Sequence, residues 1–367
     1  MFRYAQIALE LRDRIARGEY STGRLPAERT LGQEFGVQRD TIRQALEVLT
    51  QQRVLLRDST RGTYLSPEFA GEGSAAGQTA SAGRALLIVP AFDDTLALSL
   101  VLQGLSQQMD AVGIPVSWYD SGDWESPHTD EKPFLPPKML RAAQQIRGTV
   151  LWPSLPTPVD DLQILQREMP LILIDRRVPG FLADFVGFQD KEGGRKITEH
   201  LLHLGHRRIG FASGEPQAST VQDRRAGYLD ALKCAGITPD PSLELHQYGG
   251  SDLLTRASVD AFLAPKGSPL TAVVCSNDVV AAHMIQHVRR QRRHVPEDVA
   301  ITGFGDLSPS MMEAFGITTV AQGFKEMGRK AGELLLERLN GSPAVSAPSE
   351  IELPMEIIVR TSCGSRK

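Results

Sequence analysis

Residues 84–367 alternate between short apolar runs and longer amphipathic stretches. Seven runs of five or six residues have the length and composition of buried strands: RALLIV, GIPVSW, GTVLW, LILID, RRIGFA, TAVVCS and VAITGF. Helical stretches such as TLALSLVLQGLSQQMDAV and DVVAAHMIQHVRRQ separate most of them. This alternation predicts parallel sheets with helices on both faces. Because about 280 residues is large for a single sheet, we expect two lobes with a cleft between them.

A segment rich in glycine, alanine and serine, SPEFAGEGSAAGQTASAG at 66–83, precedes this body. It has almost no large apolar residue and cannot bury enough surface to fold, so it is typical of a flexible linker. We therefore predict a head at 1–65, the linker at 66–83 and the body at 84–367.

The head has the pattern of three helices and a hairpin. Apolar residues recur at helical spacing around 7–15, at 26–35 and from about 38 onward, and Gly18 and Gly36 separate these segments. The runs VLLR and GTYL then predict two short strands around the turn DST. Three helices followed by a β-hairpin make a winged helix.

Charge is divided unevenly along the chain, which has a net charge of −4. The head holds 11 arginines, no lysine and 8 acidic residues, whereas the rest holds 29 basic and 36 acidic residues. A basic head on an acidic body indicates a polyanionic partner for the head. Arginine suits this role because its guanidinium can bind phosphate or guanine through two parallel hydrogen bonds.

Arg39 and Arg43 lie on one side of the third predicted helix, away from its apolar stripe. On an isolated helix such a pair would most simply face solvent. However, LPAERTLGQEFGVQRDTIRQALEVL followed by RGTYL resembles the GntR-type winged-helix DNA-binding domain over nearly all of residues 4–65. The resemblance implies major-groove contacts for the two arginines and a minor-groove contact for the wing tip. The implied DNA-binding residues are Arg29, Gln38, Arg39, Thr41, Arg43, Arg61 and Gly62.

Two positions of the head depart from this family pattern. Gln38 stands where the family usually has serine, and Thr60 replaces the first glycine of the wing turn. Because glutamine can pair with adenine through two hydrogen bonds, we expect an altered operator preference rather than lost binding.

Seven segments of the body resemble the LacI/GalR-type regulatory domain, which is itself similar to type I periplasmic sugar-binding proteins. They are PLILIDRRVPG, HLLHLGHRRIGFASG, DRRAGYLDALKCAGI, TAVVCSNDVVAAHMI, HVPEDVAITGFGD, ITTVAQGF and EIIVRTS, in family order over most of residues 84–362. A GntR-type head joined to such a body resembles arabinose-repressor-type regulators. The implied fold is a winged helix followed by a two-lobed α/β effector domain.

The same resemblance, together with the positions of polar residues after strands, suggests a set of ligand-binding residues. They are Asp94, Arg176, Asp190, Arg224, Tyr248, Asn277, Asp278, Gln322 and Phe324. Three alternatives stay open: Arg224 as a surface helix charge, Asp278 as a helix cap and Tyr248 as a core residue.

One departure from the family pattern bears on the identity of the ligand. The family commonly has an aspartate directly after the aromatic residue of GF, whereas this chain has Gly305 there, followed by Asp306. The lost carboxylate, with Arg176 and Arg224 nearby, suggests the hypothesis of an acidic sugar derivative.

Other motifs predict neither a cofactor nor catalysis. His200, His203 and His206 are three apart, but Gly205 should end the helix before His206, so we expect no metal site. The sequence has no P-loop and no GxSxG motif, so we do not expect an enzyme. The charged N-terminal stretch MFRYAQIALELRDR and the absence of a long apolar run predict a cytoplasmic protein without membrane contact.

We therefore predict a transcriptional repressor that binds, as a homodimer, a two-fold symmetric operator in double-stranded DNA. A small carbohydrate-type ligand in the body would relieve repression. The alternatives are a ligand that acts as co-repressor or activator, and a cytoplasmic carbohydrate-binding protein or enzyme.

Overall fold

The computed structural model describes most of both predicted parts of the chain. The described residues are 7–8, 10–11, 14–15, 20, 25–51, 55–58, 62–65, 83–89, 95–120, 146–153, 157–246, 256–263, 269–341 and 347–364. The chain forms two compact units, Met1–Ala82 and Gly83–Lys367. The predicted linker at 66–83 lies outside the described residues except for Gly83.

The first unit contains the helices and hairpin expected of a winged helix. Its elements include α2 (Glu28–Phe35), α3 (Arg39–Gln51), β1 (Leu55–Asp58) and β2 (Gly62–Leu65). The two strands are antiparallel, with Leu55 opposite Leu65. Gly36 adopts φ 63° and ψ 34°, the left-handed conformation that ends α2 and turns the chain into α3. The core of this unit is made by the expected apolar stripes, including Ile7, Leu11, Leu31, Ile42 and Leu46.

The first lobe of the body is a six-stranded sheet of parallel neighbours in the order β13-β7-β6-β5-β3-β4. Its strands are β3 (Arg84–Val89), β4 (Val116–Asp120), β5 (Ile146–Leu151), β6 (Leu171–Ile174), β7 (Asp184–Phe188) and β13 (Glu350–Leu353). Its helices are α5 (Thr95–Asp110), α7 (Val159–Glu168) and α13 (Phe324–Leu339). Along β3, Leu87 and Val89 pack with α5 and α13, whereas Leu86 and Ile88 pack with α7. This period of two buries both faces of the sheet.

The second lobe is a four-stranded parallel sheet in the order β11-β10-β8-β9. Its strands are β8 (Ile209–Ser213), β9 (Glu244–His246), β10 (Ala272–Cys275) and β11 (Ala300–Thr302). Its helices are α8 (Asp190–His203), α9 (Ser219–Cys234), α10 (Arg256–Leu263), α11 (Asp278–Arg290) and α12 (Pro309–Phe315), with short 3-10 turns η3 (Pro241–Leu243) and η4 (Thr361–Cys363). Phe211 packs with α8 and α9, whereas Ala212 packs with α10 and α11. The predicted parallel sheets with helices on both faces are thus confirmed.

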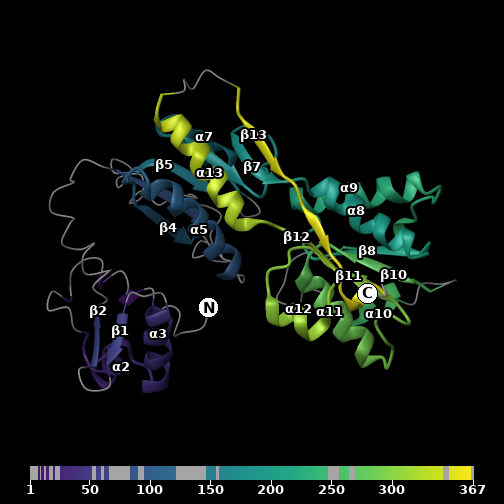
Figure 1. The fold of residues 1–367 in the computed structure, drawn as a ribbon, viewed down its shortest axis with the longest axis horizontal. Helices are drawn as coiled ribbons and strands as arrows, with labels where there is room; N and C mark the ends of the chain where they lie inside the picture. Colours follow the sequence, from purple (N-terminus) through teal and green to yellow (C-terminus); the bar gives the residue numbers. More distant parts are fainter. Residues whose placement is uncertain are drawn as a thin grey trace. The chain divides into compact units, whose positions relative to one another are not determined.

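The chain passes between the lobes at three places, which can be followed in Figure 1. One connection lies between β7 and α8. The second leads from β12 (Thr319–Ala321) to α13, and the third from β13 to β14 (Glu356–Ile358). Strands β12 and β14 pair antiparallel beside the second lobe.

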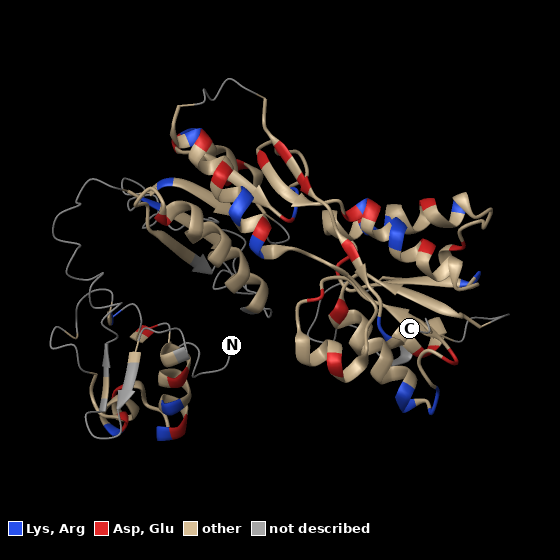
Figure 2. Cartoon of the chain, in the orientation of Figure 1, with Lys and Arg blue, Asp and Glu red and all other residues tan. Residues whose placement is uncertain are grey.

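Charge on the body is mixed. Helices α8, α9 and α13 each carry both basic and acidic segments (Figure 2). Several of these charges form ion pairs along one helix, such as Arg329 with Glu326 at 2.5 Å. Among the described helices, none is both long and apolar enough to cross a bilayer.

Candidate functional site

The exposed side of α3 carries the two arginines that the sequence singles out. Ile42 and Leu46 on the opposite side are fully buried. The side chains of Arg39 and Arg43 are 68% and 48% exposed. A short turn at Gly36 joins α2 to α3, and Val37 N–H donates to Gly32 O at 3.0 Å. This is the arrangement by which a helix-turn-helix presents its second helix to the major groove.

Glu28, the first residue of α2, contacts both arginines. Arg39 Nε donates to Glu28 Oε2 at 2.7 Å, and Arg43 Nη2 lies 3.7 Å from the same oxygen. Arg43 Nη1 also lies 3.4 Å from Asp40 Oδ1. Sequence reasoning missed Glu28, because its partners come from the next helix.

The other predicted DNA-binding residues differ in their exposure to solvent. Arg29 and Gln38 are exposed, and Thr41 is half-buried at the first turn of α3. Gly62 opens strand β2 of the wing. Arg61 lies outside the described residues.

In the body, many of the predicted ligand-binding residues follow the ends of strands, where open α/β sheets collect ligand contacts. Arg176 follows β6 in the first lobe, and Asn277 and Asp278 follow β10 in the second. Gln322 comes directly after β12, in the connection to α13. Asp94 and Tyr248 lie outside the described residues.

Arg224 and Asp190 form a buried ion pair in the second lobe. Arg224 Nε donates to Asp190 Oδ1 at 2.6 Å, and Nη1 donates to the Ser276 carbonyl at 2.7 Å. The guanidinium also stacks 4.0 Å from the centre of the Phe304 ring. Burial raises the pKa of Asp190 to about 7, although Arg224 opposes this shift. With 6% exposure Arg224 is a core group, so the surface-charge alternative is wrong.

Close contact between α8 and α9 makes this pair possible. A Cβ at Gly227 would lie 1.9 Å from the Lys191 carbonyl oxygen, and one at Gly194 would lie 2.1 Å from the Arg224 carbonyl oxygen. Only glycine permits backbones this close, because any side chain would collide with the facing helix.

Asn277 and Asp278 have different roles at the start of α11. Asn277 Oδ1 accepts a hydrogen bond from Val280 N–H at 2.8 Å and therefore caps the helix. Asp278 instead accepts from Thr319 Oγ1 and from Asp306 N–H, both at 2.6 Å. Burial raises the pKa of Asp278. The helix-cap alternative for Asp278 is thus wrong, since its neighbour is the cap.

Phe324, the first residue of α13, lies in an aromatic cluster. Its ring stacks on Trp152 at 5.6 Å between centroids and meets Phe188 edge-on at 5.4 Å. Trp152 Nε1 donates to Asp175 Oδ2 at 3.0 Å. Phe324 is 4% exposed, so it supports the connection between the lobes from within the core.

Three buried side-chain atoms among the described residues have no hydrogen-bond partner: Arg176 Nε, Ser276 Oγ and Gln322 Nε2. Arg176 Nε is 3.8 Å from Asp175 Oδ2, which is too long for a hydrogen bond. All three residues come just after a strand end. A buried polar group without a hydrogen-bond partner lowers stability by about 1–3 kcal/mol. Such groups therefore commonly bind a ligand or a water molecule. Ser276 was missed from the sequence, although it directly precedes Asn277 after a predicted strand.

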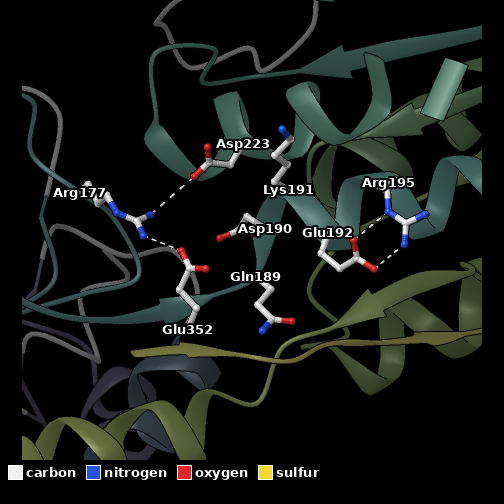
Figure 3. A pocket seen from close by; sticks show the side chains of 8 residues that line it. All are labelled: Arg177, Gln189, Asp190, Lys191, Glu192, Arg195, Asp223 and Glu352. Atoms are coloured by element: carbon white, nitrogen blue, oxygen red, sulfur yellow. Dashed lines mark hydrogen bonds and ion pairs between the residues drawn. The ribbon is translucent and has the colours of Figure 1, made fainter. Parts of the chain in front are cut away.

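A hollow of about 540 Å³ lies beside the start of α8, and Asp190 of the buried ion pair is among its lining residues (Figure 3). It is lined by Arg177, Gln189, Asp190, Lys191, Glu192, Arg195, Asp223 and Glu352. Its three cations are already paired: Arg177 with Glu352 at 2.6 Å, Arg195 with Glu192 at 2.6 Å and Lys191 with Asp230 at 2.8 Å. Each cation that lines the hollow therefore already has an acidic partner.

The histidines of EHLLHLGH lie at the end of α8. The helix ends at His203, and Gly205 has φ 94°, so His206 lies beyond the helix. His200 Nε2 lies 3.3 Å from the sulfur of Cys363. No group of three potential metal ligands is found within the described residues.

Two family models match the chain. Residues 3–65 match the bacterial regulatory proteins of the gntR family, and residues 198–363 match the periplasmic binding protein-like domain. The chain thus resembles gntR-family regulatory proteins at residues 3–65 and a periplasmic binding protein-like domain at residues 198–363. The resemblance predicted for head and body is therefore confirmed.

Several proteins that are similar to this chain in sequence are transcriptional regulators. The regulator GalR of Escherichia coli is 32% identical over 191 residues, which is 51% of this chain and 54% of GalR. The PurR repressor of Haemophilus influenzae is 31% identical over 213 residues, 61% of its length. The chain thus spans little more than half the length of these curated relatives. The arabinose metabolism transcriptional repressor of Geobacillus stearothermophilus is 25% identical over 98% of this chain and 97% of its own.

A solved structure shows the same fold. The transcription regulator GntR from Chromobacterium violaceum matches with a TM-score of 0.60 and 27% identity, over 77% of this chain and all of that one.

Proposed function

We propose that the protein is a transcriptional repressor whose binding to operator DNA is controlled by a small carbohydrate-type ligand held between the lobes of the body. The observation that carries this proposal is the set of unpartnered atoms on Arg176, Ser276 and Gln322, in a chain that begins with a gntR-type DNA-binding domain. The regulators and repressors among its relatives support the same function.

The charges at the strand ends favour an uncharged ligand. Four carboxyl groups, those of Asp175, Asp190, Glu215 and Asp278, follow strand ends, and burial raises the pKa of two of them, Asp190 and Asp278. Both of the predicted ligand-binding arginines are already paired, Arg176 with Glu215 at 2.6 Å and Arg224 with Asp190 at 2.6 Å. An anionic ligand would have to compete with these carboxylates for the two guanidinium groups, which argues against the acidic sugar derivative suggested by the sequence.

Hydrogen-bonding chemistry points to a neutral, oxygen-rich molecule. Two of the unpartnered atoms are N–H donors and the third is a hydroxyl. Asp278 lies close to the glycine that replaces the family's aspartate, since a Cβ at Gly305 would be 3.1 Å from Asp278 Oδ2. That carboxylate can accept from a sugar hydroxyl in place of the missing side chain. Asp306 is held elsewhere by Arg360, at 2.6 Å.

Ligand binding is tested by thermal unfolding of the full chain with neutral sugars, sugar phosphates and sugar acids. A ligand at 100 times its Kd should stabilise the native state by about 2.7 kcal/mol. Ser276→Ala should leave the unliganded melting temperature unchanged or higher, because it removes a buried hydroxyl that has no partner, and it should weaken the ligand shift. Ser213→Ala is the matched control, since Ser213 Oγ is buried and lies 3.0 Å from His246 Nδ1. A destabilised Ser276→Ala protein with an intact ligand shift would contradict the site.

DNA control is tested with duplexes selected by the protein from a randomised pool. We expect a two-fold symmetric preferred sequence, a dimer in sedimentation experiments and weaker binding once the ligand is added. Tighter binding with ligand would make it a co-repressor. Ligand binding without any selected DNA sequence would instead support a carbohydrate-binding protein or an enzyme.

A further inference from the structure

Glu28 contacts Arg39 and Arg43, the two arginines proposed to read DNA bases, from a different helix. It opens α2, while Arg39 and Arg43 belong to α3. Its Oε2 atom accepts from Arg39 Nε at 2.7 Å and lies 3.7 Å from Arg43 Nη2. The Glu28 side chain is only 18% exposed, whereas that of Arg39 is 68% exposed.

The atom that Glu28 binds decides what Arg39 can do. Guanine is read by two guanidinium nitrogens that donate to its O6 and N7 atoms. Because this contact uses Nε, the terminal pair Nη1 and Nη2 remains available to donate to a base. An exposed arginine otherwise samples many rotamers and loses this conformational entropy when it binds DNA. A side chain that is already oriented loses less, which favours binding to the correct base.

The charge of Glu28 acts in a second way. A carboxylate on a DNA-facing surface repels phosphates, which provide most of the affinity for DNA of any sequence. The same group should therefore lower nonspecific binding while it supports base reading. We propose that Glu28 is a positioning residue that orients Arg39 and Arg43 for base recognition and so raises the ratio of specific to nonspecific DNA affinity. This inference rests on the proposed function.

The chain offers a matched control on the same helix. Glu34 also lies on α2, but it pairs with Arg14 rather than with α3. Its side chain is 43% exposed. Substituting Glu34 removes the same charge from the same helix without touching Arg39 or Arg43.

The test uses the full chain and the preferred duplex selected by the wild-type protein from a randomised pool. Affinities for this duplex, for duplexes with single base-pair changes and for an unrelated duplex are compared among wild type, Glu28→Gln, Glu28→Ala and Glu34→Ala. We expect Glu28→Ala to lower the ratio of specific to nonspecific affinity about tenfold and to relax preference at one or two base pairs. Glu28→Gln keeps an acceptor for Arg39 Nε, so its loss should be smaller, and Glu34→Ala should stay within about twofold.

Each alternative gives a different pattern. Equal changes in Glu28→Gln and Glu28→Ala, with no change in base preference, would mean that Glu28 acts only through its charge and would overturn the proposal. A lower melting temperature with an unchanged affinity ratio would mean a purely structural role for Glu28. If the wild-type protein selects no sequence at all, it is the proposed DNA-binding function that fails.

Discussion

Arg176 and Glu215 form an ion pair that joins the two lobes of the body. Arg176 Nη2 donates to Glu215 Oε2 at 2.6 Å, from the end of β6 in the first lobe to the segment after β8 in the second. The adjacent Arg177 adds a second link, because its backbone N–H donates to Ser219 Oγ at 2.9 Å, at the start of α9. The lobes are therefore tied together beside one of the three unpartnered atoms, Arg176 Nε.

Loss of this ion pair should weaken ligand binding more than folding. The Glu215 side chain is 49% exposed, so the pair is worth at most about 1 kcal/mol. We expect Glu215→Gln to raise the Kd of a ligand found by thermal screening by up to about fivefold, with little change in melting temperature. Calorimetric titration at low and high salt measures this. Glu168→Gln, an exposed position on α7, should change neither quantity, and an unchanged Kd for Glu215→Gln at low salt would contradict the prediction.

Stability should depend on pH through Asp190. Its pKa is raised to about 7 in the folded protein by burial, well above its ordinary value of 3.8. The folded state therefore keeps a proton that the unfolded state releases, so the Asp190 contribution to the free energy of unfolding falls as pH rises from about 4 to 7. Urea unfolding at several pH values should show that the free energy of unfolding of wild type falls relative to that of Asp190→Asn between about pH 4 and 7. Parallel pH profiles for the two proteins would refute the assignment.

A methyl group at Gly227 should separate α8 from α9. Its Cβ would lie 1.9 Å from the Lys191 carbonyl oxygen, which is backbone and cannot swing aside. We expect Gly227→Ala to destabilise the body by about 1–3 kcal/mol and to weaken ligand binding, since Arg224 and Asp190 lie on these two helices. Gln222→Ala, an exposed change on α9, should stay within about 0.5 kcal/mol. Chemical denaturation of both variants provides the comparison.

Removing both arginines of α3 should abolish sequence selection without unfolding the head. Their side chains are exposed, so Arg39→Ala with Arg43→Ala should leave the melting temperature nearly unchanged. The affinity for the selected duplex should fall about 100-fold, while that for an unrelated duplex should fall much less. Fluorescence anisotropy titrations with both duplexes test this. Retained preference for the selected duplex would show that another element reads the bases.

The sequence patterns predicted four strands of the first sheet, β3, β4, β5 and β6, and three of the second, β8, β10 and β11. Each of the seven apolar runs overlaps a strand, because buried parallel strands need continuous apolar residues. Strands β7, β9, β12 and β14 were missed, because in each of them polar residues or glycine interrupt the apolar run or the strand has only three residues. Strand β13, EIEL, was missed because it carries glutamates, two of which pair with Arg177.

Positions of the candidate site could be predicted, but their partners could not. Asn277 and Asp278 were found because polar residues follow an apolar run. The role of Asp278 depends on Thr319, 41 residues further along the chain, because the Thr319 hydroxyl donates a hydrogen bond to Asp278. Glu28 escaped notice for the same reason, since its contacts with Arg39 and Arg43 arise only when α2 and α3 pack together.

The short segment from Gln322 to Phe324 connects an unpartnered donor to a helix that is packed closely on α5, since a Cβ at Gly328 would lie 2.1 Å from the Val101 carbonyl oxygen. Gln322 carries an unpartnered Nε2 atom, and two residues later Phe324 begins a helix of 16 residues that runs along the first lobe. At 1.5 Å per residue this helix is about 24 Å long, so a tilt of about 5° at Phe324 would move Leu339 by about 2 Å. Because α5 is packed on α13, a displacement that begins at Gln322 would be shared by both helices.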